Sequence, residues 1–105
     1  MPRTVMIIDD ERDANNLMAG LLEARGYQTI QVLSGKEAIE AVHRHKPDLI
    51  LLDLMLPDVD GFAICTQLKY HRDTNLIPIV MVTALNDFNH RTEGIRVGAN
   101  GYLTK

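Results

Sequence analysis

Short apolar runs alternate along the chain with longer segments in which apolar and polar residues are interleaved. Runs rich in Val, Ile and Leu are typical of strands that are buried on both faces of a parallel sheet. Strands are therefore expected at residues 4–8, 27–33, 48–52, 78–82 and 101–104. The second run is interrupted by polar residues and the fifth is short, so these two give the weaker signals.

The interleaved segments repeat apolar residues every three or four positions, as amphipathic helices do. The first predicted helix carries its apolar residues at positions 14, 17, 18, 21 and 22. Candidate N-caps for the other three helices are Ser34, Asp60, and either Asn86 or Asp87. Residues that stop a helix follow three of the segments: Gly26, Pro47 and Gly98. This alternation favours an α/β fold of parallel βαβ units with right-handed crossovers.

Length and composition narrow the class of protein. A chain of 105 residues corresponds to one domain, so residues 1–105 are expected to form a single unit. The apolar content of 46% and charged content of 24% exclude a disordered tail, a collagen-like fibre and a coiled coil. The net charge of −3 gives no general attraction for nucleic acid, and direct contact with nucleic acid is not expected.

Apolar runs and cysteine content bear on location. No apolar run approaches the roughly 18 residues of a membrane span. The apolar stretch near the N-terminus is too short for a secretory signal. Cys65 is the single cysteine, so no internal disulfide can form. A cytoplasmic protein with no membrane contact is expected, with Cys65 as a small packing residue.

Polar residues capable of chemistry follow several of the predicted strands. Asp9 and Asp10 follow the first strand, Asp53 the third, Thr83 the fourth and Lys105 the fifth. In an open parallel sheet these strand ends share one edge, where ligands bind at the point of strand-order reversal. If the first and third strands are neighbours, the three carboxylates meet there.

Three crowded carboxylates repel one another unless a cation or a proton intervenes. Carboxylates together with a backbone carbonyl and water suit Mg²⁺. With a lysine and a hydroxyl nearby, such a site can bind a phosphoryl group, and a carboxylate can form an aspartyl phosphate. The alternative for each residue taken alone is a helix cap, a turn former or a solvated terminus. That alternative gives no reason for all of them to share one edge.

Four segments of the chain resemble the receiver domain of two-component response regulators. They are residues 8–11, 53–61, 82–84 and 101–105, which read IDDE, DLMLPDVDG, VTA and GYLTK. The resemblance implies a flavodoxin-like, doubly wound sheet of five parallel strands in the order 2-1-3-4-5. It also implies that the module is not an enzyme but assists its own phosphorylation and dephosphorylation.

The resemblance implies a role for each acidic residue of the site. Asp53 would be the phosphoacceptor for a phosphoryl group from a histidine kinase or a phosphotransfer protein. Asp10 and Asp53 would bind Mg²⁺ directly, together with the main-chain carbonyl of Met55. Asp9 would assist through a bound water.

Further roles follow from the same resemblance. Lys105 would pair with the phosphoryl group, and Thr83 would donate its hydroxyl to a phosphoryl oxygen. Tyr102 would be the aromatic switch that moves inward, which changes the surface of the fourth helix and fifth strand and so controls a downstream output. Met55 and Leu85 would flank the phosphoryl group, and because both are apolar, slow loss of phosphate is expected.

The chain departs from the family pattern after Lys105, where a fifth helix is expected and is missing. We therefore expect a receiver domain truncated at its C-terminal end, with part of one sheet face left as an exposed apolar patch. A homodimer could form through that face or through the side of the fourth helix and fifth strand.

Two other classes of function remain open. One is a metal-dependent phosphatase of the haloacid dehalogenase type, although Met55 stands where that family has a second carboxylate. The other is an interaction module that works without phosphorylation, which would be expected to lack Asp10, Asp53 or Lys105.

Overall fold

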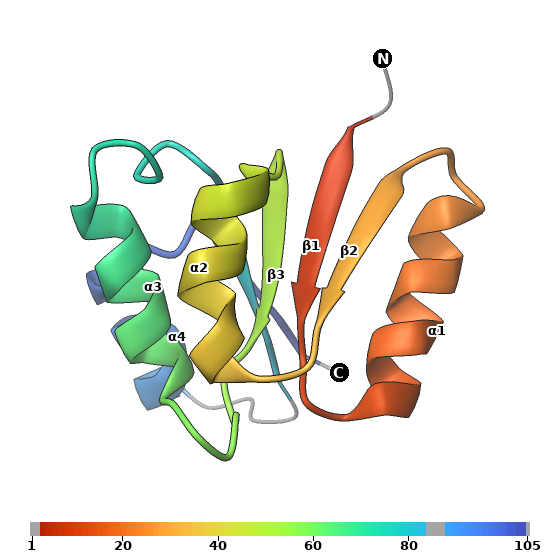
Figure 1. Cartoon of the computed structure of the whole chain (residues 1–105). Coiled ribbons are helices and arrows are strands. Elements are labelled where there is room, and N and C mark those ends of the chain that lie inside the picture. Colours follow the sequence, from red (N-terminus) through yellow and green to blue (C-terminus); the bar gives the residue numbers. More distant parts are fainter. Residues whose placement is uncertain (1–2, 84–87, 105) are drawn as a thin grey trace.

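The computed structural model of the chain describes residues 3–83 and 88–104, with the backbone alone at 88–91. Strands and helices alternate strictly along these residues (Figure 1). Their order is β1 (Thr4–Ile8), α1 (Arg12–Glu23), β2 (Gln28–Val32), α2 (Gly35–His45), β3 (Leu49–Asp53), α3 (Gly61–Tyr70), β4 (Ile79–Thr83), α4 (Phe88–Arg96) and β5 (Gly101–Thr104). Each predicted strand and helix is present, and the described part of the chain holds four helices.

The strands form one sheet in the order β2-β1-β3-β4-β5. All four pairings are parallel, with Ile8 opposite Leu52 and Asp53 opposite Val82. The order reverses between β1 and β3, because the chain moves outward to β2 and then crosses back past β1. This confirms the predicted doubly wound sheet and places the switch point between β1 and β3, the position where such folds bind ligands.

The sheet separates two apolar cores, because alternate residues of each strand point to opposite faces. Met6, Ile8, Ile50 and Leu52 are fully buried on the face covered by α2, α3 and the end of α4. The opposite face packs against α1, which lies on the other side of the sheet (Figure 1). Its buried residues are Val5, Ile7, Ala19, Leu51 and Val82.

The α1 side is less completely covered than the other. Met18, Ala19 and Leu22 pack onto the sheet, but Leu17 is 66% exposed and Leu21 is 60% exposed. Both line an apolar hollow of about 260 Å³ between α1 and the sheet. The exposed apolar patch expected from the sequence is therefore present on this face.

The predicted helix caps can be checked at two of the helices. The Ser34 hydroxyl accepts a hydrogen bond from the Glu37 amide at 3.4 Å, and the Asp60 carboxylate accepts one from the Phe62 amide at 2.9 Å. Both caps are confirmed, while the candidate caps Asn86 and Asp87 lie outside the described residues. None of the helices described has the length and apolar character that crossing a membrane requires.

Candidate functional site

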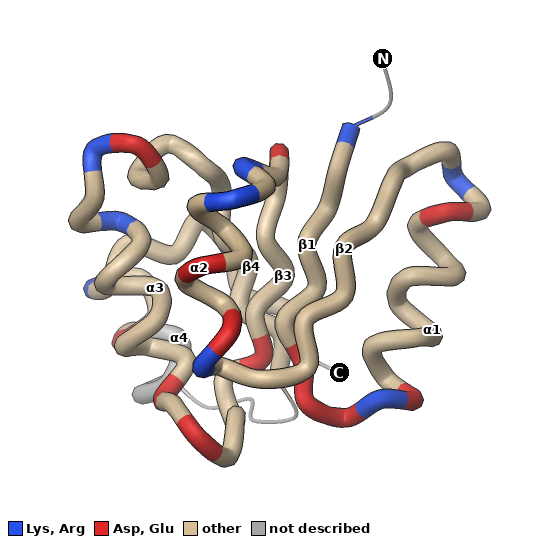
Figure 2. The backbone as a smooth tube through the Cα atoms, viewed as in Figure 1, with Lys and Arg blue, Asp and Glu red and all other residues tan. Residues whose placement is uncertain are grey.

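An acidic cluster lies where β1 and β3 end. Asp9, Asp10 and Asp53 each offer a carboxylate oxygen, and these oxygens all lie within 4.8 Å of one another. The cluster forms because β1 and β3 are paired in register, with Ile8 opposite Leu52, so the residues that come next on the two strands lie side by side. Figure 2 shows acidic residues at the lower ends of both strands. The convergence predicted from the sequence is therefore present.

Two carboxylates of the cluster are held by backbone amides. Asp9 and Asp53 are each 6% exposed, whereas Asp10 is exposed. The Asp9 carboxylate accepts a hydrogen bond from the Glu11 amide at 3.0 Å. The Asp53 carboxylate accepts one from the Met55 amide at 3.2 Å. These bonds fix the orientation of both carboxylates.

Asn15 supports the cluster from behind. It is fully buried in α1, and its side-chain amide nitrogen lies 3.0 Å from the carbonyl oxygen of Asp9. The same nitrogen lies 3.2 Å from the carbonyl oxygens of Ile7 and Val32. Asn15 thus ties the start of α1 to the ends of β1 and β2. Sequence reasoning missed this residue, although a polar residue within an apolar helix stripe is a usable signal.

The loop after Asp53 is fixed by a contact with α2. The Asp58 carboxylate accepts hydrogen bonds from the amides of Lys36 at 2.9 Å and Gly35 at 3.0 Å, at the N-terminus of α2. The hydrogen bond from Lys36, aided by that from Gly35, lowers the pKa of Asp58 below its usual value. The loop between Asp53 and α3 is therefore anchored to a neighbouring helix.

Gly61 allows α3 to begin directly against β3. A Cβ atom at this position would lie 2.8 Å from the carbonyl oxygen of Asp53 and 2.9 Å from the Cα of Leu54. Both neighbours are backbone atoms that cannot move aside without shifting the end of β3. The glycine is thus required by the close approach of the helix to the residue that carries the central carboxylate.

Of the remaining predicted site residues, the structure describes Thr83 and Met55 near the acidic cluster. Thr83 is fully buried at the end of β4, one position beyond the pairing of Asp53 with Val82. Met55 lies two residues after Asp53. Its side chain is exposed, and its amide donates the hydrogen bond to the Asp53 carboxylate. Lys105 and Leu85 lie outside the described residues.

Tyr102 lies farther from the cluster, opposite Met81 on the pair β4–β5. It is half-buried and packs against the larger core, and its ring comes close to Gly94 of α4. Tyr102 and Gly94 border a surface hollow of about 300 Å³ between α4 and β5. The ring thus lies between the core and the surface.

Cys65 does not belong to the site. Its side chain is fully buried in α3 and packs in the larger core. Burial raises the pKa of the thiol to about 11, so the nucleophilic thiolate is absent at neutral pH. Its predicted role as a packing residue is confirmed.

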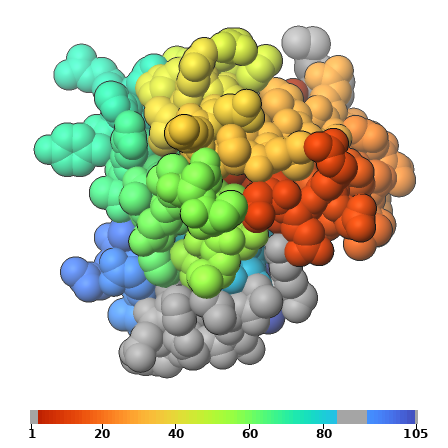
Figure 3. Space-filling model, turned by 60° about the horizontal axis from the view of Figure 1, so that its bottom comes forward, coloured from red at the N-terminus to blue at the C-terminus, as the bar shows by residue number. Residues whose placement is uncertain are grey.

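The edge that carries the cluster is turned toward the reader in Figure 3, where the start of α1 lies beside the segment that follows β3. Three carboxylates in close proximity form a hard, all-oxygen donor set that fits Mg²⁺ and suits soft metals poorly. The fold and this cluster together define a doubly wound α/β protein with an acidic site at the switch point of its sheet.

The chain belongs to the response regulator receiver domain family, whose family model matches residues 5–105. It is thus a signalling domain of two-component systems, as the resemblance in the sequence predicted. The fold agrees: a response regulator from Chloroflexus aurantiacus superposes with a TM-score of 0.95 at 33% identity, over all of this chain and 86% of that one. The chemotaxis protein CheY4 of Vibrio cholerae gives 0.94 at 26% identity, over all of this chain and 88% of that one.

Curated relatives are longer proteins. The chain is 42% identical to the DNA-binding dual master transcriptional regulator RpaA of Synechocystis sp., over 100% of this chain and 43% of RpaA. It is 38% identical to the phosphate regulon transcriptional regulatory protein PhoB of Pseudomonas aeruginosa, over 98% of this chain and 45% of PhoB. The chain therefore spans less than half the length of these relatives.

Proposed function

We propose that residues 1–105 act as a phosphoacceptor module, with Asp53 taking a phosphoryl group from a phosphohistidine on a histidine kinase or phosphotransfer protein. The observation that supports this most strongly is the convergence of Asp9, Asp10 and Asp53, whose oxygens lie within 4.8 Å of one another. Asp53 is the central carboxylate, because it ends the strand that lies between β1 and β4.

The proposed transfer is a displacement at phosphorus. A carboxylate oxygen of Asp53 attacks the phosphorus atom, an O–P bond forms, and the P–N bond to the donor imidazole breaks. The bonding electrons leave with the imidazole nitrogen, which takes up a proton. The hydrogen bond from the Met55 amide holds the Asp53 carboxylate in one orientation for this attack.

Mg²⁺ is the proposed cofactor and would neutralise negative charge on the transferring group. Asp10 and Asp53 would hold it directly with the main-chain carbonyl of Met55, and Asp9 would assist through a water molecule. Thr83 would donate its hydroxyl to a phosphoryl oxygen, and Lys105 would pair with the phosphoryl charge. Among the described residues, Asp9 and Asp10 follow β1, Asp53 ends β3 and Thr83 ends β4, all at the same edge of the sheet.

The output of the module would be a changed surface on α4 and β5. Phosphorylation adds about −1.5 to −2 charges and three strong acceptors at Asp53. Movement of Thr83 toward them would make room for the Tyr102 ring, which lies between the core and the hollow beside Gly94. Phosphorylation would thus shift the population between two states of the α4–β5 surface, and a downstream partner would bind one of them more tightly.

The module would transmit a signal without turning over a substrate, in the cytoplasm where a kinase can reach it. It would assist only its own phosphorylation and dephosphorylation, and it would not itself contact nucleic acid. Self-association through the α4–β5 side or through the apolar face beside α1 is part of the proposal, and the exposed Leu17 and Leu21 support the second of these surfaces.

Intact mass spectrometry after treatment with acetyl phosphate and Mg²⁺ tests the proposal. We expect one phosphoryl adduct that is labile to base, absent without Mg²⁺ and absent in Asp53→Asn. The matched control Asp13→Asn removes an acidic residue of α1 outside the cluster and should retain the adduct.

Two outcomes would contradict the proposal. Sustained hydrolysis of phosphate monoesters would identify a phosphatase instead. A folded protein that binds Mg²⁺ but forms no adduct with any phosphodonor would identify an interaction module that works without phosphorylation.

A further inference from the structure

A second group of side chains with metal-ligating atoms lies at the opposite edge of the sheet from the acidic cluster. His43 is in the last turn of α2, while His71 and Asp73 belong to the segment between α3 and β4. In Figure 1 the end of α2 and this segment lie at the top of the molecule, and the strands β1 and β3 end at the bottom. The group therefore shares no residue with the site described above.

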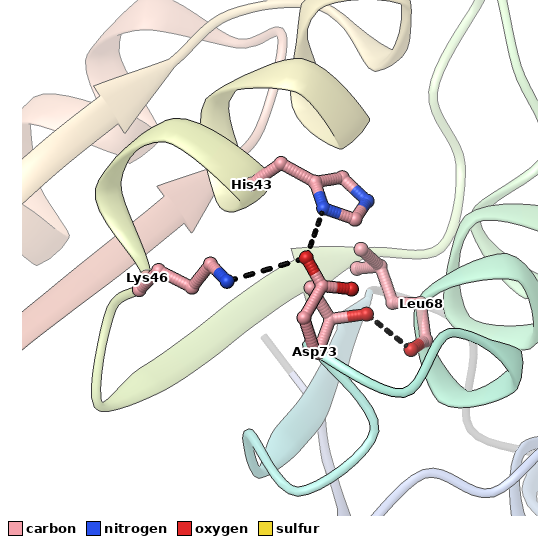
Figure 4. Close-up of polar contacts among 5 residues, drawn as sticks. His43, Lys46, Leu68 and Asp73 are labelled. Atoms are coloured by element: carbon pink, nitrogen blue, oxygen red, sulfur yellow. Dashed lines mark hydrogen bonds and ion pairs between the residues drawn. The ribbon is translucent and has the colours of Figure 1, made fainter.

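The three side chains converge closely. Each offers one ligand atom, and these atoms all lie within 4.8 Å of one another. Nδ1 of His43 lies 2.9 Å from Oδ2 of Asp73, as Figure 4 shows. The rings of His43 and His71 meet edge to face, with their centroids 5.2 Å apart. Side chains from two separate segments thus point toward a common centre.

We propose that His43, His71 and Asp73 bind a divalent transition-metal ion of the Zn²⁺ class. Two imidazoles and one carboxylate are a borderline donor set that suits Zn²⁺ and related ions far better than Mg²⁺. Three protein ligands leave the fourth position of a tetrahedral site to water. The acidic cluster, built of oxygen donors alone, has the reverse preference.

The surroundings make the site accessible and its carboxylate available. The side chains of His43 and Asp73 are 31% and 48% exposed, so an ion can enter from solvent. Oδ2 of Asp73 is held by two partners that lie at the surface, His43 at 2.9 Å and Lys46 at 3.2 Å. Because the ligands are exposed, small rotations about their side-chain bonds can bring them to bonding distance.

Lys46 competes with the ion for Asp73. Its ammonium group lies 3.2 Å from the same Oδ2 that faces His43 (Figure 4). In the absence of metal this cation neutralises Asp73, and a bound ion has to displace it. Binding would thus exchange one cationic contact for a metal bond that joins α2 to the α3–β4 segment.

Histidine side-chain NMR spectra during titration with Zn²⁺ test the proposal. We expect the resonances of His43 and His71 to shift and to saturate at one ion per chain, while those of His45 stay in place. Mg²⁺ should move none of them. Because Zn²⁺ held by the acidic cluster would leave the histidines unperturbed, the readout separates the two sites, and Asp53→Asn should behave as the unmodified chain does.

Variants give the titration a sharper readout. His71→Ala, at an exposed position, should weaken Zn²⁺ binding at least about tenfold, while the matched control His45→Ala should not change it. Lys46→Gln should strengthen binding, because it removes the competing cation while keeping the carboxylate. The proposal is overturned if Zn²⁺ shifts no histidine, shifts all of them alike, or binds His71→Ala and the unmodified chain equally.

Discussion

Met55 is 62% exposed, and its amide holds the Asp53 carboxylate. Its side chain therefore lies beside the proposed phosphorylation site and, being exposed, can be substituted without disturbing the core. A thioether cannot orient a water molecule for attack, because it neither donates a hydrogen bond nor accepts a strong one. The identity of this one side chain should thus influence how long a phosphoryl group stays on Asp53.

Met55→Gln is predicted to shorten the lifetime of the phosphorylated form severalfold, since an amide can hold an attacking water. The decay of the phosphoryl adduct after removal of the phosphodonor, followed by intact mass, measures this lifetime. Met55→Leu serves as control, because it keeps the position apolar at similar size. Equal lifetimes for all three proteins would show that position 55 has no influence on hydrolysis.

At the scale of elements, two glycines in helices give opposite predictions. Gly61→Ala puts a Cβ against the backbone of Asp53 and Leu54, and we expect it to lower the free energy of unfolding by about 1–3 kcal/mol. Gly20→Ala, in α1 with open space around it, should raise that free energy by about 0.5–1 kcal/mol. Urea denaturation of the two variants measures both effects.

Each glycine variant is the control for the other, because both change glycine to alanine within a helix. If Gly61→Ala were as stable as the unmodified chain, the close approach of α3 to the end of β3 would be relaxed in solution. The Asp53 carboxylate would then be less firmly positioned than the structure indicates.

The loop contact between Asp58 and α2 should make stability depend on pH. The folded state holds the pKa of Asp58 below its usual value, so the unfolded chain takes up the proton first as pH falls. The stabilisation is therefore complete above about pH 4, the usual range of an aspartate, and is lost as pH drops through the lowered folded pKa. Asp58→Asn should destabilise the protein at pH 7, and the difference should shrink as pH falls below about 4.

Urea midpoints of both proteins at several pH values measure this difference. Asn supplies one acceptor oxygen where the Asp58 carboxylate supplies two, one for Gly35 and one for Lys36. A difference in unfolding free energy that stayed constant from pH 7 to pH 2 would contradict the assignment.

The positions of the elements could be predicted because periodicity and caps are local signals. The Ser34 and Asp60 caps and the buried face of α3 are examples. The second strand was predicted at 27–33 but is Gln28–Val32, because its flanking residues pair with nothing in the sheet. Lys46 ends α2 in the left-handed conformation, with φ of 47°, which a lysine does not signal.

At the scale of the whole molecule, the two side-chain clusters differ in how far sequence could predict them. The acidic cluster follows from topology alone, because parallel strands end at one edge and β1 pairs with β3. The group of His43, His71 and Asp73 depends on where the α3–β4 segment folds back onto α2, and on side-chain rotamers. Neither is encoded in a period or a motif, so the histidines look scattered in the sequence.

The acidic cluster should also govern the stability of the whole domain. Three carboxylates within 4.8 Å repel one another, and a bound Mg²⁺ reverses that repulsion. Without Mg²⁺, Asp10→Asn should raise the free energy of unfolding by about 1 kcal/mol, or Tm by roughly 4 °C, because it removes one exposed charge. Adding Mg²⁺ should raise the Tm of the unmodified chain and have much less effect on the variant.

Thermal unfolding with EDTA and with Mg²⁺ measures both quantities. Asp13→Asn is the matched control, since it removes an acidic residue of α1 outside the cluster and should leave the Mg²⁺ increment unchanged. If Asp10→Asn were less stable than the unmodified chain in EDTA and kept the full Mg²⁺ increment, the carboxylates would not be sharing a cation. The ion would then have to bind elsewhere, and the charge-repulsion account of this edge of the sheet would fail with it.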